Sequence, residues 1–158
     1  MASLPGVFRP PLIRDIDAMY ALIQYWANKD QMLVRHPNEL CENIRDFMVY
    51  EEDGKILGLC GLHVIWKDLA EIRALAVSPE HFGRDIGGRL VRLLTDEARR
   101  LGIAKVFTLT YVPGFFQKLG FQVVEKSALP HKIWVDCVRC HKFPDCDETG
   151  MIFIVDPA

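Results

Sequence analysis

The sequence predicts an α/β fold in which a mixed, mostly antiparallel sheet is flanked by helices and built as one unit. Three observations support this prediction. Two helical patterns open the chain, three strand-like apolar segments follow in succession, and helices then alternate with strands. With 158 residues, half of them hydrophobic, the chain is expected to form one domain over residues 1–158 with its own core.

Apolar periodicity indicates the first helices. In "RDIDAMYALIQYWANKD", apolar side chains recur every three or four positions between Ile16 and Trp26, which is typical of an amphipathic helix. Asp15 or Asp17 is expected to cap its start. The segment "HPNELCENIRDF" predicts a second, shorter helix, with Pro37 in its first turn.

Three strands are expected next. Asp53 and Gly54 separate two apolar runs in "FMVYEEDGKILGLCGLHVIW", and this dipeptide is the strongest short hairpin signal because both residues tolerate positive φ. The segment "AEIRALAVS" follows Lys67 and Asp68. It is expected to be the next strand of the same antiparallel sheet.

The second half of the chain alternates helices with strands. Residues 87–101 carry a leucine-rich helical pattern that Gly102 closes. The segment "AKVFTLTYV" predicts a strand, "PGFFQKLG" a short helix and "FQVVEK" another strand. The segment "GMIFIVD" predicts a last strand, and residues 127–149 before it are interpreted as an irregular, cysteine-bearing insertion.

Composition excludes some classes of function. The formal net charge is only -2, which predicts neither a nucleic-acid partner nor a membrane surface. No run approaches the roughly 18 apolar residues of a membrane span, and the opening "MASLPGVFRP" lacks the pattern of a signal peptide. A cytoplasmic location is therefore expected.

The loop between the third strand and the long helix has a candidate chemical role. It carries Gly83, Gly87 and Gly88 together with Arg84 and Arg89. A strand that turns at once into a helix presents unpaired backbone N–H groups and the positive end of the helix dipole, so a phosphate or pyrophosphate fits there. The alternative is a tight turn with solvated arginines. No Gly-Lys-Ser/Thr and no G-x-G-x-x-G pattern is present.

The succession "EIRALAVSPEHFGRDIGGRLV", "VFTLTY" and "FFQKLGF" resembles the Gcn5-related N-acetyltransferases (GNAT), whose acetyl-CoA loop reads Gln/Arg-x-x-Gly-x-Gly/Ala. In the register that keeps the helix in place, Phe82, Asp85 and Gly87 take the three fixed positions, and two of them depart from the pattern. A shift to "RDIGGR" restores Arg84 and Gly87 but places Arg89 where a small residue belongs. Asp85 could instead be the helix N-cap.

The resemblance implies acetyl-CoA as co-substrate. Its pyrophosphate is expected at the loop and its pantetheine along the backbone of the preceding strand, if the sheet splays there. The implied cofactor-binding residues are Leu75, Ala76, Val77, Phe82, Gly83, Arg84, Asp85, Ile86, Gly87 and Gly88.

A narrower resemblance covers most of the chain from about Phe8. The segments "QMLVRHPNEL", "GLCGLHVIWKDLAEIRALAV", "FTLTYVPGFFQKLGF" and "LPHKIWVDCVRCHKFPDCDE" are similar to the short N-acetylglutamate synthases. This resemblance implies acetylation of the α-amino group of glutamate at the start of arginine biosynthesis, by direct attack without a covalent intermediate.

The reaction requires a base and a proton donor. Glu71 is the candidate base, because it lies among apolar residues in the strand that leads to the loop. A structural carboxylate paired with Arg73 or Lys67 is the alternative. Phe116 replaces the tyrosine that many acetyltransferases carry, so Tyr111, Thr110 or a water is expected to deliver the proton.

Glutamate has two carboxylates, which guanidinium and ammonium groups bind well. Arg35 matches the substrate-side arginine of the family. Lys132, Arg73 and Ala74 are further substrate-binding candidates. His36 and His63 are interpreted as satisfied polar neighbours, because no carboxylate stands at a suggestive spacing from either.

The cysteine-bearing segment "HKIWVDCVRCHKFPDC" could hold a structural zinc ion. Cys137 and Cys140 form a C-x-x-C pair that Cys146 and either His131 or His141 could complete. A cluster of reduced thiols is the alternative.

Three function classes remain open. The first is glutamate N-acetylation, and the second is acetyl transfer to another small amine or a protein N-terminus. The third is a protein without catalytic turnover: either a module that binds acyl-CoA as a sensor, or an interaction domain stabilised by a zinc ion. The expected partner is a small-molecule substrate, and a homodimer is an open alternative to a monomer.

Overall fold

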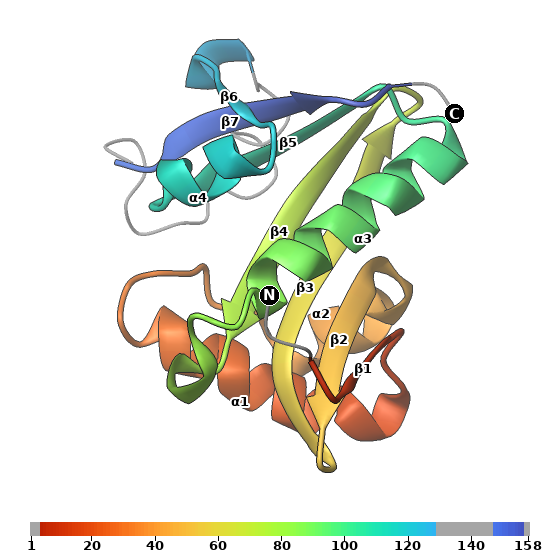
Figure 1. The fold of residues 1–158 in the computed structure, drawn as a ribbon, viewed down its shortest axis with the longest axis vertical. Coiled ribbons are helices and arrows are strands. Elements are labelled where there is room, and N and C mark those ends of the chain that lie inside the picture. The colour runs from red at the N-terminus through yellow and green to blue at the C-terminus, as the bar shows by residue number, and fades with distance from the viewer. Residues whose placement is uncertain (1–3, 129–146, 157–158) are drawn as a thin grey trace.

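The computed structural model describes residues 4–128 and 147–156. These residues form a seven-stranded sheet with the order β1-β2-β3-β4-β5-β7-β6 (Figure 1). Neighbouring strands are antiparallel except for the central pair, β4 and β5, which is parallel. The strands are β1 Val7–Arg9, β2 Phe47–Glu52, β3 Lys55–Trp66, β4 Leu69–Val77, β5 Lys105–Thr110, β6 Gln122–Val123 and β7 Thr149–Ile154. The expectation of a mixed, mostly antiparallel sheet with flanking helices is confirmed.

Helices cover both faces of this sheet (Figure 1). The α-helices are α1 Ile16–Ala27, α2 Pro37–Glu42, α3 Ile86–Leu101 and α4 Pro113–Lys118. Short 3-10 turns are formed by Ile13–Asp15, Ile44–Asp46, Pro79–His81 and Lys126–Ala128. No helix in residues 4–128 and 147–156 is long and apolar enough to span a membrane.

The core has two parts, one on each face of the sheet. On one face, Met19 and Ile23 of α1 pack with Leu40 of α2 against strand side chains such as Val49. On the other face, Leu90 of α3 belongs to a cluster that also contains residues of β3 and β4. This division follows from the strand period of two, because successive side chains point to opposite faces.

The structure confirms two local predictions: the hairpin turn at Asp53 and Gly54, and the end of the long helix at Gly102. Asp53 and Gly54 have φ values of 52° and 76°, as a tight two-residue hairpin turn requires. Gly102 closes α3 with φ 82°. A left-handed residue at the end of a helix is most easily a glycine, because glycine has no Cβ to clash.

The ends of the sheet differ from the expectation. Strand β1 was not predicted, because three residues carry too little pattern and the strand depends on pairing with the distant β2. Strand β6 spans two residues rather than the whole of "FQVVEK". Strand β7 begins at Thr149, so the strand takes in the last residue of the expected insertion.

Two irregularities of β4 open the sheet. Strands β4 and β5 pair only from Leu69 to Glu71 and diverge beyond that point (Figure 1). On the other side, Leu59 pairs with Ala76 and Gly61 with Arg73, so two residues of β4 oppose one of β3. Such a bulge bends a strand, and its second sign is Ala74, whose φ is 56°. The expected splay of the sheet is confirmed.

Candidate active site

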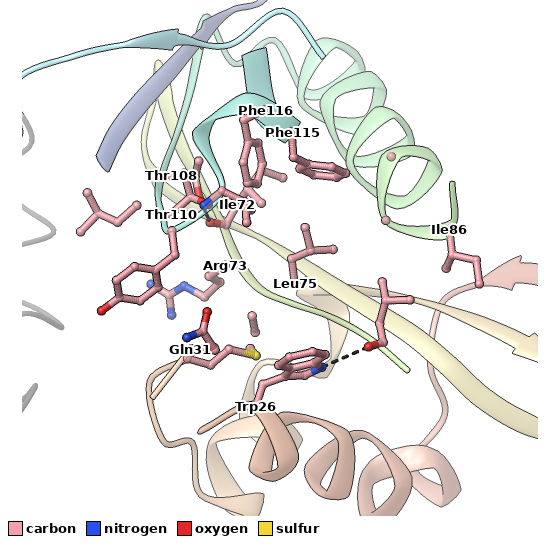
Figure 2. Close-up of a pocket in the computed structure, with 18 of the residues that line it drawn as sticks. Trp26, Gln31, Ile72, Arg73, Leu75, Ile86, Thr108, Thr110, Phe115 and Phe116 are labelled. Carbon is pink, nitrogen blue, oxygen red and sulfur yellow. Dashed lines mark hydrogen bonds between the residues drawn. The ribbon is translucent and has the colours of Figure 1, made fainter. Parts of the chain in front are cut away.

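A cavity of about 720 Å³ lies where the sheet splays. Helix α1 and the segment after it, strand β4, the loop before α3, the end of β5 and helix α4 all contribute to its walls (Figure 2). Its size is in the range of small-molecule binding sites.

Most of the predicted site residues that the structure describes line this one cavity. They are Arg35, Glu71, Arg73, Ala74, Leu75, Val77, Phe82, Gly83, Asp85, Ile86, Gly87, Gly88, Thr110 and Tyr111. Ala76 and Arg84 are not among the lining residues. The side chain of Ala76 is buried in the core beneath α1, and Arg84 bonds Glu52 on β2.

Glu71 is the most enclosed charged residue of the site, with 1% of its surface exposed. Its Oε1 accepts hydrogen bonds from Arg73 Nη2 at 2.9 Å and Arg73 Nε at 3.2 Å. The two side chains meet because residues two apart on a strand share a face. The pairing with Arg73, which the structural alternative expects, is therefore present. The pair also orients the carboxylate beside the cavity.

Three side chains with hydroxyl groups line the cavity near the end of β5. Thr108 donates its hydroxyl proton to the carbonyl of Ile72 at 3.0 Å, which bridges β5 to β4 where they begin to separate. Thr110 Oγ1 accepts a hydrogen bond from the N–H of Val112 at 2.9 Å. The Thr108 proton is committed to the bridge, so Thr110 and Tyr111 remain the candidate proton donors on side chains.

Phe116 is 3% exposed and packs edge-on against Phe115 and Phe121. Both Phe115 and Phe116 line the cavity (Figure 2). The position that carries a tyrosine hydroxyl in many acetyltransferases is therefore an apolar wall in this chain.

The loop before α3 contains two residues with a left-handed backbone conformation. Gly83 and Asp85 have φ values of 86° and 61°, and α3 begins at Ile86. Asp85 occupies the first glycine position of the acetyl-CoA pattern in the unshifted register. Its positive φ agrees with that register, because the pattern places glycine where a left-handed conformation is needed. The shifted register would place this glycine at Gly87, inside α3.

The Asp85 carboxylate lies against the first turn of α3. It accepts a hydrogen bond from Arg92 at 3.0 Å and makes no capping hydrogen bond with its side chain. A Cβ placed on Gly88 would lie 2.1 Å from Asp85 Oδ1. Asp85 therefore stands at the N-cap position, but its carboxylate pairs with an arginine instead of capping the helix.

Arg84 is held on β2, away from the cavity. Its guanidinium donates to Glu52 at 2.6 Å and 3.2 Å, and the hydroxyl of Tyr50 donates to Glu52 Oε1 at 2.6 Å. Arg84 and Tyr50 lower the pKa of Glu52 to about 2. Burial, then the bond to Glu52, raises the pKa of Tyr50. The Tyr50 oxygen also accepts the N–H of Gly6.

Trp26 also lines the cavity. The sequence predicted only that it lies on the apolar face of a helix. Its ring stacks on Phe82 with centroids 5.6 Å apart. Its Nε1 donates to the carbonyl of Val77 at 3.1 Å, the bond drawn as a dashed line from Trp26 in Figure 2. Helix α1 is thereby joined to the end of β4 and to the loop. Spacing alone could not reveal these contacts, since they join residues more than fifty positions apart.

The sequence did not predict several other residues that line the cavity. They come from the segment after α1, from β4, from the loop and from the chain around β5 and β7, and are Gln31, Met32, Leu33, Ile72, His81, Thr108, Leu109, Val112 and Glu148. No local motif distinguishes them.

Arg35 is 7% exposed although it carries a full charge. It lines the cavity, and its Nη1 lies 3.7 Å from Glu39 Oε2 one turn along α2. A buried guanidinium on a cavity wall suits recognition of a carboxylate.

The predicted zinc ligands Cys137, Cys140, Cys146 and His141, and the substrate candidate Lys132, lie outside the described residues. In the part of the chain that the structure describes, no group of three or more His, Cys, Asp or Glu side chains could hold a metal ion. The zinc site and the role of Lys132 stay predictions.

Comparison with known sequences shows the family of this chain. Residues 13–121 match the model of the acetyltransferase (GNAT) family. An uncharacterized N-acetyltransferase of Chlorobaculum tepidum is 36% identical, over 96% of this chain and 98% of its own length. An amino-acid acetyltransferase of Mycobacterium tuberculosis is 33% identical, over 89% of this chain and 84% of its own.

Solved structures have the same fold. N-acetylglutamate synthase from Neisseria gonorrhoeae, complexed with coenzyme A and N-acetylglutamate, superposes with a TM-score of 0.87 at 26% identity. The match covers 98% of this chain but 36% of that one, so the chain spans about a third of that protein. A Mycobacterium tuberculosis protein in complex with coenzyme A has a TM-score of 0.81 at 29% identity and is covered over 99% of its length. The matched residues, the splayed sheet and the cavity all indicate the same family: the chain belongs to the GNAT family and is an N-acetyltransferase.

Proposed function

We propose that this chain transfers the acetyl group of acetyl-CoA to the α-amino group of glutamate, at the start of arginine biosynthesis. One observation carries the proposal: a single cavity joins an enclosed carboxylate, Glu71, and two guanidinium groups, Arg35 and Arg73, to the glycine-bearing loop before α3. A dianionic amino acid needs such cations, and its amino group needs a base. The name of the Mycobacterium relative supports an amino acid as acceptor, and that of the Neisseria structure supports glutamate.

The loop and the splayed strands fit acetyl-CoA. Gly83, Gly87 and Gly88 line the cavity at the start of α3, where backbone N–H groups and the helix dipole favour a pyrophosphate. Gly87 and Phe115 both line the cavity, and a Cβ on Gly87 would lie in van der Waals contact with the Phe115 ring, at 3.4 Å. The pantetheine would lie along the backbone of Leu75 and Val77, which β5 does not cover.

In the proposed reaction, acceptor and acetyl-CoA are bound together. Glu71 takes a proton from the acceptor amine, directly or through a water, and the nitrogen attacks the thioester carbonyl. The N–C bond forms, the C–S bond breaks, and Thr110, Tyr111 or a water delivers a proton to the leaving sulfur. No residue of the chain is acylated on the way.

Substitution of Arg35 tests the acceptor. Arg35→Lys should raise the KM for glutamate because an ammonium cannot form a bidentate pair, and Arg35→Ala should raise it further. Loss of one charge-assisted contact costs about 1.5–3 kcal/mol, or roughly ten- to hundredfold in kcat/KM. Arg99→Lys, on the surface of α3, is the matched control.

Comparison of glutamate with glutamine then assigns the carboxylates. If Arg35 binds the γ-carboxylate, the parent enzyme should discriminate against glutamine and Arg35→Ala should not. If Arg35 binds the α-carboxylate, its loss should impair both substrates alike, and Lys132→Ala should narrow the gap between them. Equal turnover of glutamate, glutamine and unrelated amines by the parent enzyme would refute the glutamate proposal.

A second acceptor class has one observation in its favour. Glu148 and Asp85 also line the cavity, so carboxylates outnumber guanidinium groups on its described walls. Such walls suit another small amine or a protein N-terminus. Release of free coenzyme A, measured against free amino acids, polyamines and short peptides, separates this acceptor class from glutamate.

A further inference from the structure

Acetylation of an amine leaves a proton behind. The acceptor arrives as an ammonium ion and its nitrogen loses two protons in becoming an amide. The departing thiolate takes up one of them. One proton per turnover must therefore leave the site, and the general base must pass it on before the next cycle.

Glu71 cannot release this proton straight into bulk water, because it is 1% exposed. Its access to solvent is the cavity, which acetyl-CoA and the acceptor occupy during the reaction. While the cavity is occupied, a second route through protein neighbours would let the base release its proton before the products leave.

The register of the sheet places His63 beside Glu71. The two residues are paired on the antiparallel strands β3 and β4. Directly opposite residues have Cβ atoms about 4.5–5.5 Å apart on the same face, so one water suffices to join the two side chains. The neighbouring pair, Leu62 with Ile72, points into the core beneath α3. Glu71 and His63 therefore share the face covered by α1 and α2.

A carboxylate holds the imidazole ring from the other side. His63 Nδ1 lies 2.7 Å from Asp46 Oδ2, at the end of the 3-10 turn before β2. Both side chains are about one third exposed, at 32% for His63 and 27% for Asp46. The sequence predicted no carboxylate partner for His63. Asp46 lies 17 positions upstream, and only the tertiary structure brings it to the imidazole ring.

We propose that His63, supported by Asp46, is the proton outlet of Glu71. The proton moves from Glu71 to the imidazole, through a water, and from the imidazole to solvent. Asp46 orients the ring through Nδ1, as a carboxylate does for a catalytic histidine. The charged neighbours of this route on the strands and the turn are Asp46, Glu71 and Arg73, and Arg73 bonds Glu71. The outlet rests on the proposed role of Glu71 as the base, but it serves acetyl transfer to any amine and does not depend on glutamate as the acceptor.

Chemical rescue tests the outlet. His63→Ala should lower kcat roughly tenfold, at the lower end of proton-transfer effects, with both KM values unchanged. Added imidazole should restore most of the loss, whereas tetramethylammonium at the same concentration, which carries no proton, should not. Glu71→Gln, measured alongside, supplies the background rate of acetyl-CoA cleavage by imidazole.

Asp46→Asn provides a second variant that keeps the ring. Its kcat should fall by a smaller factor, and small buffer bases should raise it. Asp96→Asn, which removes a carboxylate paired with Arg99 at the same 2.7 Å on α3, is the matched control and should leave kcat unchanged. The proposal is overturned by a folded His63→Ala with full kcat, or by a loss of kcat that imidazole does not repair. If His63→Ala does not fold, an unchanged kcat in Asp46→Asn overturns it.

Discussion

The two ends of the cavity are built on different principles. At the proposed acceptor end, Glu71 is 1% exposed and fixed by Arg73, and the chemistry belongs to side chains. At the proposed cofactor loop, residues 82–88, Phe82 is 60% exposed, and the groups suited to a pyrophosphate are backbone N–H groups. We therefore expect function at the acceptor end to depend on residue identity, and function at the loop to depend on backbone shape.

This difference explains how the loop can depart from the acetyl-CoA pattern without losing its form. Asp85 replaces a glycine and still adopts a φ of 61°, which aspartate tolerates better than most residues. Phe82 replaces a polar residue and gains a stacking partner in Trp26. Substitutions that keep the backbone should therefore have small effects at the loop, and conservative changes at Glu71 should have large ones.

The largest effect is expected at Glu71. Glu71→Gln keeps the shape of the side chain and removes its basicity, so kcat should fall by roughly 10²–10⁴. Acetyl-CoA affinity, measured by calorimetry, should stay near that of the parent. A full-rate Gln variant would make Glu71 a structural partner of Arg73 and remove the contrast between the two ends.

Acetyl-CoA binding should weaken when a large, charged side chain replaces Gly87 on the cavity wall. Gly87→Glu places a carboxylate at the start of α3, and acetyl-CoA affinity should fall at least roughly tenfold, because a negative charge there opposes the helix dipole. Gly87→Gln, of the same size without the charge, separates bulk from charge. Unchanged calorimetric affinity in both variants would place the pyrophosphate elsewhere.

A smaller effect is expected behind the loop, where Glu52 anchors Arg84. Glu52→Gln should raise the KM for acetyl-CoA roughly threefold, the loss expected for an ion pair near the surface, and leave kcat unchanged. Arg100→Gln, which removes the more exposed ion pair of Arg100 with Glu97 on α3, is the control. A lowered kcat with unchanged KM would contradict this positioning role.

The same anchor predicts a pH dependence of stability. The pKa of Glu52 is lowered from 4.5 to about 2, so its contribution is present above about pH 4.5 and is lost as the pH falls toward 2. The stability gap between the parent and Glu52→Gln, measured by urea unfolding, should close across this interval. A constant gap would mean that Glu52 keeps no such ion pair in solution.

The smallest effect is expected at Asp85. Asp85→Gly restores the residue type that suits a positive φ and removes a negative charge beside the proposed pyrophosphate site. Its bond to Arg92 is exposed and should contribute little. Acetyl-CoA should bind equally well or a few times more tightly by calorimetry. Weaker binding would give Asp85 a positive role and make the loop depend on residue identity after all.

Local sequence determined much of the fold. The period of α1, the Asp53-Gly54 turn and the Gly102 end of α3 each depend on residues close together in the chain, where propensity and φ preference decide the structure. The resemblance to a known family placed the loop and Glu71, and the structure brings both to one cavity. The role of each residue there stays a prediction.

Only the tertiary structure decided which distant residues meet. Arg84, expected at the phosphates, is held by Glu52 across 32 positions, and Trp26 reaches Val77 across 51. The pairing of His63 with Glu71 depends on strand register, and its contact with Asp46 depends on a turn before another strand. Such contacts arise from packing between elements, which residue spacing does not encode, because the same pattern of apolar and polar residues is compatible with many partners. Sequence therefore determined the elements and the candidate chemistry, and folding selected the neighbours that give each charge its role.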